Sequence, residues 1–299
     1  MGYWAFYDQL IATNWSERNI TMKDNIIEKV KEEITFENVL ATAMKAPGVK
    51  VNRVKFLRKE LKKYCSDDVI SSAINSNPAK AGIPRELIDK ISKQIINYET
   101  TKVTGISMAA SIPGGAAAVG AAAADITSYF AFILRTVQEL AYLYGFEQFD
   151  LNDDEVDAET MNTVLLFIGV MFGVQGAAST LQKFANVLAK QISKKLAQKA
   201  LTKGTIYPIV KKVATSVGIR MTKQIFADTV ASAVPILGGA LSGGLTYAMF
   251  RPGCMKLRRN LRSYNLCNPE FYKSASEEPD KEVIDVEFVE TDSIDNESE

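Results

Sequence analysis

Apolar side chains recur with a helical period along much of this 299-residue chain. The clearest example precedes Gly145. Its apolar residues stand at positions 126, 129, 130, 133, 134, 137, 140, 141 and 144. Spacings of three and four residues place such side chains on one face of an α-helix, and a glycine directly after them is a typical helix terminator. The pattern predicts an all-α fold, a multi-helix bundle whose hydrophobic helices are rich in glycine and alanine.

Turn-forming residues divide the chain before residue 100 into shorter helices. A basic helix is expected from Asn52 to Tyr64. Asn77-Pro78 ends the next helix, and Pro84 lies in the first turn of the one after it, where its missing N–H leaves no bond unmade. We assign residues 1–100 to an N-terminal helical region.

Three long segments are almost free of charge. Residues 103–134 contain one charged residue, Asp125, and residues 160–182 and 229–250 contain none. At ~1.5 Å per residue, a helix of about 20 residues is long enough to cross a bilayer. Alanine and glycine supply little apolar area, however, so these segments favour membrane insertion only weakly. They could pack in a protein core or enter lipid, and the pattern leaves both open.

Glycines at short intervals within these segments predict close helix–helix contacts. The candidate helix-packing or membrane residues are Gly114, Gly115, Gly120, Gly169, Gly173, Gly238, Gly239 and Gly243. Small residues four apart, as at Gly239 and Gly243, allow two backbones to approach closely, so we expect a homo-oligomer.

Charge is strongly segregated behind a formal net charge of zero. Residues 183–223 hold ten Lys or Arg residues and no acid, and residues 251–262 add five more. Such a basic amphipathic region is typical of proteins that bind an anionic membrane surface or another polyanion. The candidate anion-binding residues are Lys190, Lys194, Lys195, Lys199, Lys203, Lys211, Lys212, Arg220 and Lys223.

The opposing charge lies in the C-terminal tail, because residues 270–299 contain twelve acids. We predict residues 266–299 to be an acidic, disordered tail, and residues 101–265 to be the hydrophobic helical core with its basic helices. The tail could simply keep the chain soluble, or it could occupy the basic residues until a stronger polyanion displaces it.

Catalytic and metal-binding chemistry finds no support in the sequence. The chain has no histidine, which excludes Ser-His-Asp and Cys-His catalysis. Its three cysteines form no C-x-x-C pair, so we interpret them as reduced thiols. No Gly-Lys-Ser/Thr follows a glycine loop, and the run beginning at Asp150 has Glu155 where a calcium loop needs glycine. We predict a non-enzymatic protein without a cofactor, a metal or catalytic residues.

The first residues lack the basic region and the long apolar run of a secretory signal. We therefore expect the protein at the cytoplasmic face of the inner (plasma) membrane, or in the cytoplasm with conditional membrane insertion.

Five short segments of the chain, taken in their order and spacing, also suggest a protein family. They are Ile112-Pro113-Gly114-Gly115, Ala124-Asp125-Ile126, Leu140-Ala141-Tyr142-Leu143-Tyr144-Gly145-Phe146, residues 167–176, and Val234-Pro235 with Gly238-Gly239. Together they are similar to the signature of the EcsC protein family, over roughly residues 40–260.

The resemblance implies membrane association without an established reaction. Some members of that family serve as membrane effectors in anti-phage defence, where a nucleotide or oligonucleotide signal controls a pore. We therefore expect a membrane-associated effector or channel whose basic region binds an anionic ligand, either a nucleotide or oligonucleotide or an anionic lipid. The alternative is a soluble helical accessory protein, attached peripherally to a membrane transporter or to an anionic membrane.

Overall fold

The computed structural model describes residues 36–110, 117–149, 151, 156, 158–190, 208–209, 211–216 and 235–277. Within these residues every regular element is helical, so the prediction of an all-α multi-helix bundle is confirmed. In chain order the elements are α2 (Phe36–Lys45), α3 (Arg53–Leu61), α4 (Asp67–Asn75), α5 (Arg85–Ala110), α6 (Ala117–Leu143), α7 (Ala158–Phe172), α8 (Ala177–Ala189), α11 (Pro235–Ser263), the 3₁₀ helix η1 (Asn265–Cys267) and α12 (Pro269–Glu277).

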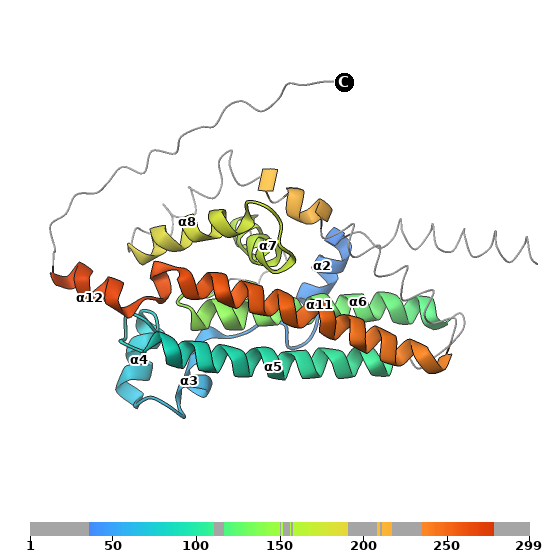
Figure 1. Cartoon of the computed structure of the whole chain (residues 1–299), viewed down its shortest axis with the longest axis horizontal. Helices are drawn as coiled ribbons and strands as arrows, with labels where there is room; N and C mark the ends of the chain where they lie inside the picture. The colour runs from blue at the N-terminus through green and yellow to red at the C-terminus, as the bar shows by residue number, and fades with distance from the viewer. Residues whose placement is uncertain are drawn as a thin grey trace, which may run out of the picture.

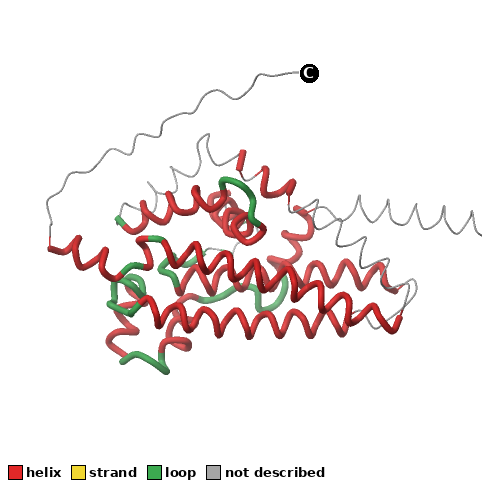
Figure 2. Tube along the Cα trace, in the orientation of Figure 1, coloured by secondary structure: helices red, strands yellow, loops and turns green. Residues whose placement is uncertain are grey.

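Three long helices, α5, α6 and α11, lie side by side and form the body of the molecule (Figure 1). Helix α5 packs against both α6 and α11, and α2 packs against α6. Helices α7 and α8 contact each other and α11, and they cover one side of the long helices (Figure 2). A single cluster of buried apolar side chains extends through all of these elements.

The short helices begin and end close to the predicted turn residues, although α3 ends at Leu61, three residues before the predicted limit at Tyr64. Asn52 caps α3, since its side-chain oxygen accepts a hydrogen bond of 2.9 Å from the backbone N–H of Lys55. Helix α4 ends at Asn75, just before Asn77-Pro78, and α5 begins directly after Pro84. These segments therefore take their boundaries from local capping and proline chemistry.

The predicted apolar face of α6 lies in the core. Phe130, Ile133, Leu134 and the other apolar residues from 137 to 144 are buried. Gly145 follows the helix with a φ of 102°. A Cβ atom there would also lie 3.0 Å from the backbone oxygen of Leu266, so glycine suits this turn on both grounds.

The second uncharged segment, residues 160–182, does not form one long helix. It is divided between α7 and α8 by a turn at Gly173–Gly176. The side chains of residues 163–171 are buried in protein, so this segment belongs to the core. In the part of the chain that the structure describes, no helix combines the length and the apolar character that a membrane crossing requires.

Helical structure is continuous across residue 100 and extends beyond residue 266. The limit at residue 100 falls inside α5, whose residues 85–110 form one continuous helix. The tail predicted from residue 266 begins with ordered structure: Leu266 and Cys267 are buried, and α12 follows them. Leu266 and Cys267 pack in the core, and most of the acidic residues lie further along the chain.

Candidate functional site

Three of the nine predicted anion-binding residues can be placed. Lys190 follows the end of α8, and Lys211 and Lys212 lie in a short stretch that is helical at residues 208–209 and 211–216; all three are exposed. The other six lie outside the described residues. They are Lys194, Lys195, Lys199, Lys203, Arg220 and Lys223.

Lysines from two separate parts of the chain meet at the turn between α7 and α8. The ammonium group of Lys212 lies 3.4 Å from the side-chain oxygen of Gln175 in this turn. The ammonium group of Lys256, from α11, lies against Gly173, in the space that a side chain at Gly173 would occupy. We call Lys211, Lys212 and Lys256 the basic cluster. Lys256 was not among the residues predicted from the sequence.

The chain around the basic cluster is nearly free of acids. Residues 160–269 contain fifteen Lys or Arg residues and a single acid, Asp228. Four further cations from this part of the chain are exposed on α8, directly after it and on α11. They are Lys183, Lys190, Arg259 and Arg262. Asp89 of α5 pairs with Arg258 and Arg262, but no acid of residues 160–269 other than Asp228 is available to offset the remaining charges.

Gly169 is in close contact with two neighbouring segments. A Cβ atom on Gly169 would lie 2.6 Å from Cγ2 of Val213 and 2.9 Å from Cβ of Ala177. Val213 is fully buried by this contact. The helical run at residues 211–216 therefore docks on α7 at Gly169, and this contact positions Lys211 and Lys212.

The other candidate glycines have different environments or fall outside the described residues. Gly173 does not continue α7, because its φ of 72° places it in the turn that follows the helix. Gly120 lies in α6, and Gly238, Gly239 and Gly243 lie in α11, at positions where only the backbone is described. Gly114 and Gly115 lie outside the described residues.

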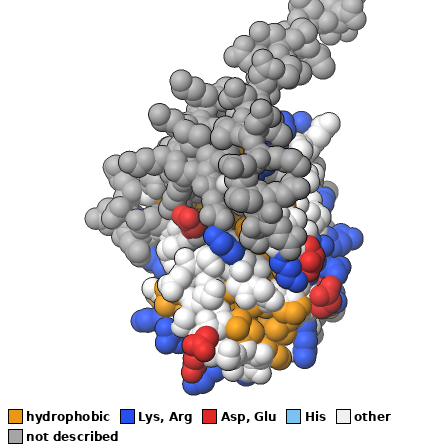
Figure 3. All heavy atoms as spheres, turned by 90° about the vertical axis from the view of Figure 1, so that its left-hand side faces the viewer, with side chains coloured by type: hydrophobic (Ala, Val, Ile, Leu, Met, Phe, Trp, Pro, Cys, Tyr) orange, Lys and Arg blue, Asp and Glu red, His pale blue; other side chains and the backbone are white. Residues whose placement is uncertain are grey.

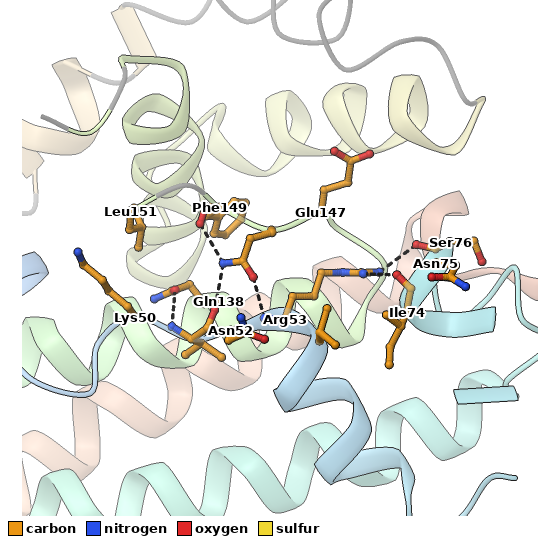
Figure 4. A pocket seen from close by; sticks show the side chains of 13 residues that line it. Lys50, Asn52, Arg53, Ile74, Asn75, Ser76, Gln138, Glu147, Phe149 and Leu151 are labelled. Carbon is orange, nitrogen blue, oxygen red and sulfur yellow. Dashed lines mark hydrogen bonds between the residues drawn. The ribbon is translucent and has the colours of Figure 1, made fainter. Parts of the chain in front are cut away.

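A pocket of about 530 Å³ lies between the α2–α3 connection, the end of α4 and the residues after α6 (Figure 4). Its charged lining side chains are Lys50, Arg53 and Glu147. In Figure 4 the Glu147 carboxylate points away from the Arg53 guanidinium.

Arg53 uses its side chain to hold backbone carbonyl groups. Its guanidinium donates to the carbonyl oxygens at the C-terminal end of α4 and to one after α6. These are the oxygens of Ala73, Ile74, Ser76 and Phe146, at 2.7–3.2 Å. Burial lowers the pKa of Arg53, although nearby Glu147 opposes that effect. A positive charge at the C-terminal end of a helix is favourable, so Arg53 has a structural role.

Two glutamines hold the extended segment that forms another wall of the pocket. Gln138, buried on α6, accepts a hydrogen bond of 3.0 Å from the N–H of Val51 and donates one of 2.8 Å to the oxygen of Val49. Gln148 donates to the oxygen of Val51 at 3.1 Å and accepts from the N–H of Arg53 at 2.7 Å. These amides are engaged by the protein itself, so they are not available to a ligand.

A second polar cluster, which the sequence did not predict, is buried between α5 and α6. Arg135 lies 3.3 Å from Glu99 and 2.9 Å from Glu139, and it also donates a 2.6 Å hydrogen bond to the oxygen of Gly48. Glu99 and Glu139 are only 1% and 4% exposed. Burial, and secondarily the charge of Glu99, raises the pKa of Glu139 to about 7. Two buried carboxylates thus share one guanidinium.

The sequence contained only a weak indication of this cluster. Arg135 and Glu139 are four residues apart on a helix face that is otherwise apolar, a spacing that permits an ion pair. Glu99 lies 36 residues before Arg135, so its approach depends on how α5 packs against α6.

The described thiols are not arranged for nucleophilic chemistry. Cys254 and Cys267 are buried, and burial raises the pKa of both, that of Cys267 to about 12. Cys65 is half-buried, and its pKa is raised for the same reason. Thiolate, the reactive form, is therefore scarce at neutral pH. Among the residues that the structure describes, no three cysteine or carboxylate side chains are grouped so that they could hold a metal ion.

Comparison of the chain with protein-family models, with curated proteins and with solved structures finds no match. The resemblance to the EcsC family therefore stays a prediction from the sequence.

Proposed function

We propose that the protein is a membrane-associated, non-enzymatic effector that binds a phosphate-bearing anion through the basic cluster. The observation that carries this proposal is the convergence of Lys212 and Lys256 on the α7–α8 turn, in a part of the chain almost without acids. Lysine ammonium groups are compact charges that bind phosphate oxygens, and neighbouring lysines repel one another until an anion is bound.

The packing around the turn supports a defined site. Val213 is buried against Gly169, and a Cβ on Gly176 would lie 3.5 Å from Ile209. The short run that carries Lys211 and Lys212 is therefore anchored by apolar contacts on both sides of the turn. Anchored charges lose less conformational freedom when a ligand binds, which favours affinity.

A peripheral accessory protein is the second candidate. The observation that favours it is the burial of α7 in protein, since this helix comes from one of the three uncharged segments. In this alternative the basic cluster holds the protein on an anionic membrane or beside a transporter. Pore formation and a role in anti-phage defence, which the family resemblance implies, stay predictions.

Binding measured over a series of salt concentrations tests the proposal. The full chain is titrated with a single-stranded oligonucleotide and, separately, with vesicles containing phosphatidylserine. In the variant Lys211→Gln/Lys212→Gln/Lys256→Gln, each lost phosphate contact should flatten the slope of log affinity against log salt by about 0.7 to 0.9. We expect a change of about 2 or more for whichever polyanion is the ligand.

A matched variant controls for net charge. Lys62→Gln/Lys63→Gln/Lys80→Gln removes three exposed lysines, two directly after α3 and one after α4, and it should retain the slope and affinity of the parent. The proposal is wrong if the two triple variants behave alike with both polyanions. Loss with the oligonucleotide alone, or with the vesicles alone, identifies the ligand.

A further inference from the structure

The ends of the three long helices gather at one end of the molecule. Helix α5 runs toward this end and stops at Ala110, whereas α6 and α11 start there, at Ala117 and Pro235 (Figure 1, right-hand side). The contacts of α5 with α6 and with α11 keep the three helices side by side.

This end is almost devoid of charge. Helix α5 carries no charged residue after Lys102, and α11 carries none before Arg251. Helix α6 carries one, Asp125, before Arg135. The opposite end, around α4 and α12, displays both cationic and anionic side chains around a hydrophobic patch (Figure 3). The two ends therefore offer different surfaces to a partner.

Large apolar side chains are exposed near the last charged residues before the uncharged end. The described structure exposes four large apolar side chains. Three of them, Tyr98 (59% exposed), Ile106 (44%) and Tyr247 (50%), lie on α5 and α11 at or near the last charged residues. A water-exposed helix face would not be expected to concentrate such residues.

Cations lie among these aromatic side chains. The ammonium group of Lys102 lies 4.7 Å from the centre of the Tyr98 ring and 5.9 Å from that of Phe132. Arg251 lies 3.5 Å from the side-chain oxygen of Asn97, which fixes how α11 is aligned with α5. From this contact, Lys102 lies ~7 Å along α5 and Tyr247 ~6 Å along α11 toward the uncharged end. Lys102 and Tyr247 therefore stand at about the same level.

Tyrosine with lysine or arginine at one level is the arrangement that proteins use at the boundary between water and lipid. The amphipathic tyrosine ring sits among the headgroups, and a long cationic side chain extends its charge to them. We propose that the protein enters a lipid bilayer with this end, and that Tyr98, Lys102, Tyr247 and Arg251 lie at the headgroup level. This inference rests on the membrane association proposed above and names the surface that makes it.

The helix lengths define how deep this insertion goes. Beyond Lys102, α5 continues for eight residues, or ~12 Å, and α11 has twelve residues before Tyr247, or ~18 Å. The hydrocarbon core of a bilayer is ~30 Å thick. This end thus reaches into one leaflet and does not cross the membrane, and Asp125 of α6 is the one charged residue of the three long helices that it takes there. This agrees with the finding that no described helix is long and apolar enough to span it.

Partition onto neutral vesicles at high salt isolates this apolar contact. In ~1 M salt the Debye length is about 3 Å, so attraction between the basic cluster and the vesicles is largely screened. Phosphatidylcholine vesicles remove the anionic lipid as well. We expect the full chain to bind these vesicles, and the variant Tyr98→Ser/Ile106→Ser/Tyr247→Ser to bind at least tenfold more weakly.

Two controls keep the outcome specific. Val54→Ser alters the fourth exposed apolar side chain, which lies on α3, and should bind as the parent does. The variant Lys211→Gln/Lys212→Gln/Lys256→Gln should also retain binding to neutral vesicles. Because all of the altered side chains are exposed, each variant should unfold at the denaturant concentration of the parent.

The inference is overturned if the parent does not partition onto neutral vesicles at high salt, or if the triple serine variant partitions as the parent does. Binding to anionic vesicles at low salt alone would overturn this inference and leave the proposed function standing. Unchanged partition with a changed oligomeric state, measured by light scattering, would instead assign the uncharged end to contact between copies of the chain.

Discussion

Glu139 and Glu99 are two buried carboxylates that contact the same guanidinium, that of Arg135. Arg135 can balance one negative charge, and it contacts both side chains, at 2.9 and 3.3 Å. One oxygen of Glu99 has no hydrogen-bond partner in the described structure. Arg135, together with Lys102, whose ammonium group lies 4.0 Å from Glu99, only partly offsets the poor solvation and mutual repulsion of two ionised carboxylates in the interior. Proton uptake by Glu139 relieves that repulsion.

The stability of the fold should therefore depend on pH through Glu139. Its pKa in the folded protein is about 7, whereas an ordinary glutamate titrates near about 4.3. Between these values the folded state holds a proton that the unfolded chain has released, so the free energy of unfolding falls as pH rises. The loss is complete above about pH 7 and amounts to at most about 4 kcal/mol.

Urea denaturation at pH values from 4.5 to 8 measures this effect. Glu139→Gln keeps the shape of the side chain but cannot ionise, so relative to this variant the parent should lose stability progressively across that interval. Glu60, Lys59 and Arg135, which also act on Glu139, are unchanged in the comparison. Glu86→Gln, at an exposed position of α5, should preserve the parent's pH dependence. A constant difference between parent and Glu139→Gln would contradict the assignment.

At the scale of helices, the contact between α7 and residues 211–216 depends on the absence of a side chain at Gly169. Gly169→Ala would bring Cβ within 2.6 Å of Val213, so one of the two segments must move. We expect a loss of about 1–3 kcal/mol in the free energy of unfolding. Val213→Ala in the same chain should recover part of it, because it removes the clashing atom.

Gly105→Ala is the matched control. This glycine lies within α5, and nothing lies within 4 Å of where its Cβ would be. Alanine is the better helix former by up to about 1 kcal/mol, so this variant should be as stable as the parent or more so. Both substitutions add the same methyl group to a helix, and only the first meets a neighbour. Equal effects of the two on denaturant midpoints would show that the close contact is misplaced.

Helix boundaries could be predicted because they depend on neighbours in the chain. Asn52, Pro84 and Gly145 act on the residues directly beside them, and the structure places the helix ends there. Burial of residues 160–182 could not be predicted in the same way, since a core segment and a lipid segment have the same composition. Only the packing of α7 and α8 against α11 distinguishes the two.

Candidate site residues were harder to predict for a related reason. Lys212 was recognised because charge density is visible along the chain, but Lys256 joins it from α11. Glu99 meets Arg135 across 36 positions in the same manner. Neither contact leaves a local pattern, so only the packing of the helices reveals them.

At the scale of the whole molecule, opposite charges occupy separate parts of one chain. Residues 160–269 hold fifteen cations and one acid, whereas residues 278–299 hold ten acids and one lysine, Lys281. The net charge of zero is therefore a balance between regions. Because both regions belong to one chain, each is present at a high effective concentration relative to the other.

Removing residues 278–299 tests whether the acidic region competes with a ligand for the basic cluster. The deletion raises the formal net charge from 0 to +9 and leaves α12 complete. If the acids compete, the shortened protein should bind an oligonucleotide or phosphatidylserine vesicles more tightly at low salt, and the gain should fade as salt screens the competition.

A general change in charge would also tighten binding, so the deletion is compared in the parent and in Lys211→Gln/Lys212→Gln/Lys256→Gln. Competition at the basic cluster predicts a smaller gain in the variant. An equal gain in both, or none in either, would leave residues 278–299 no role at that site.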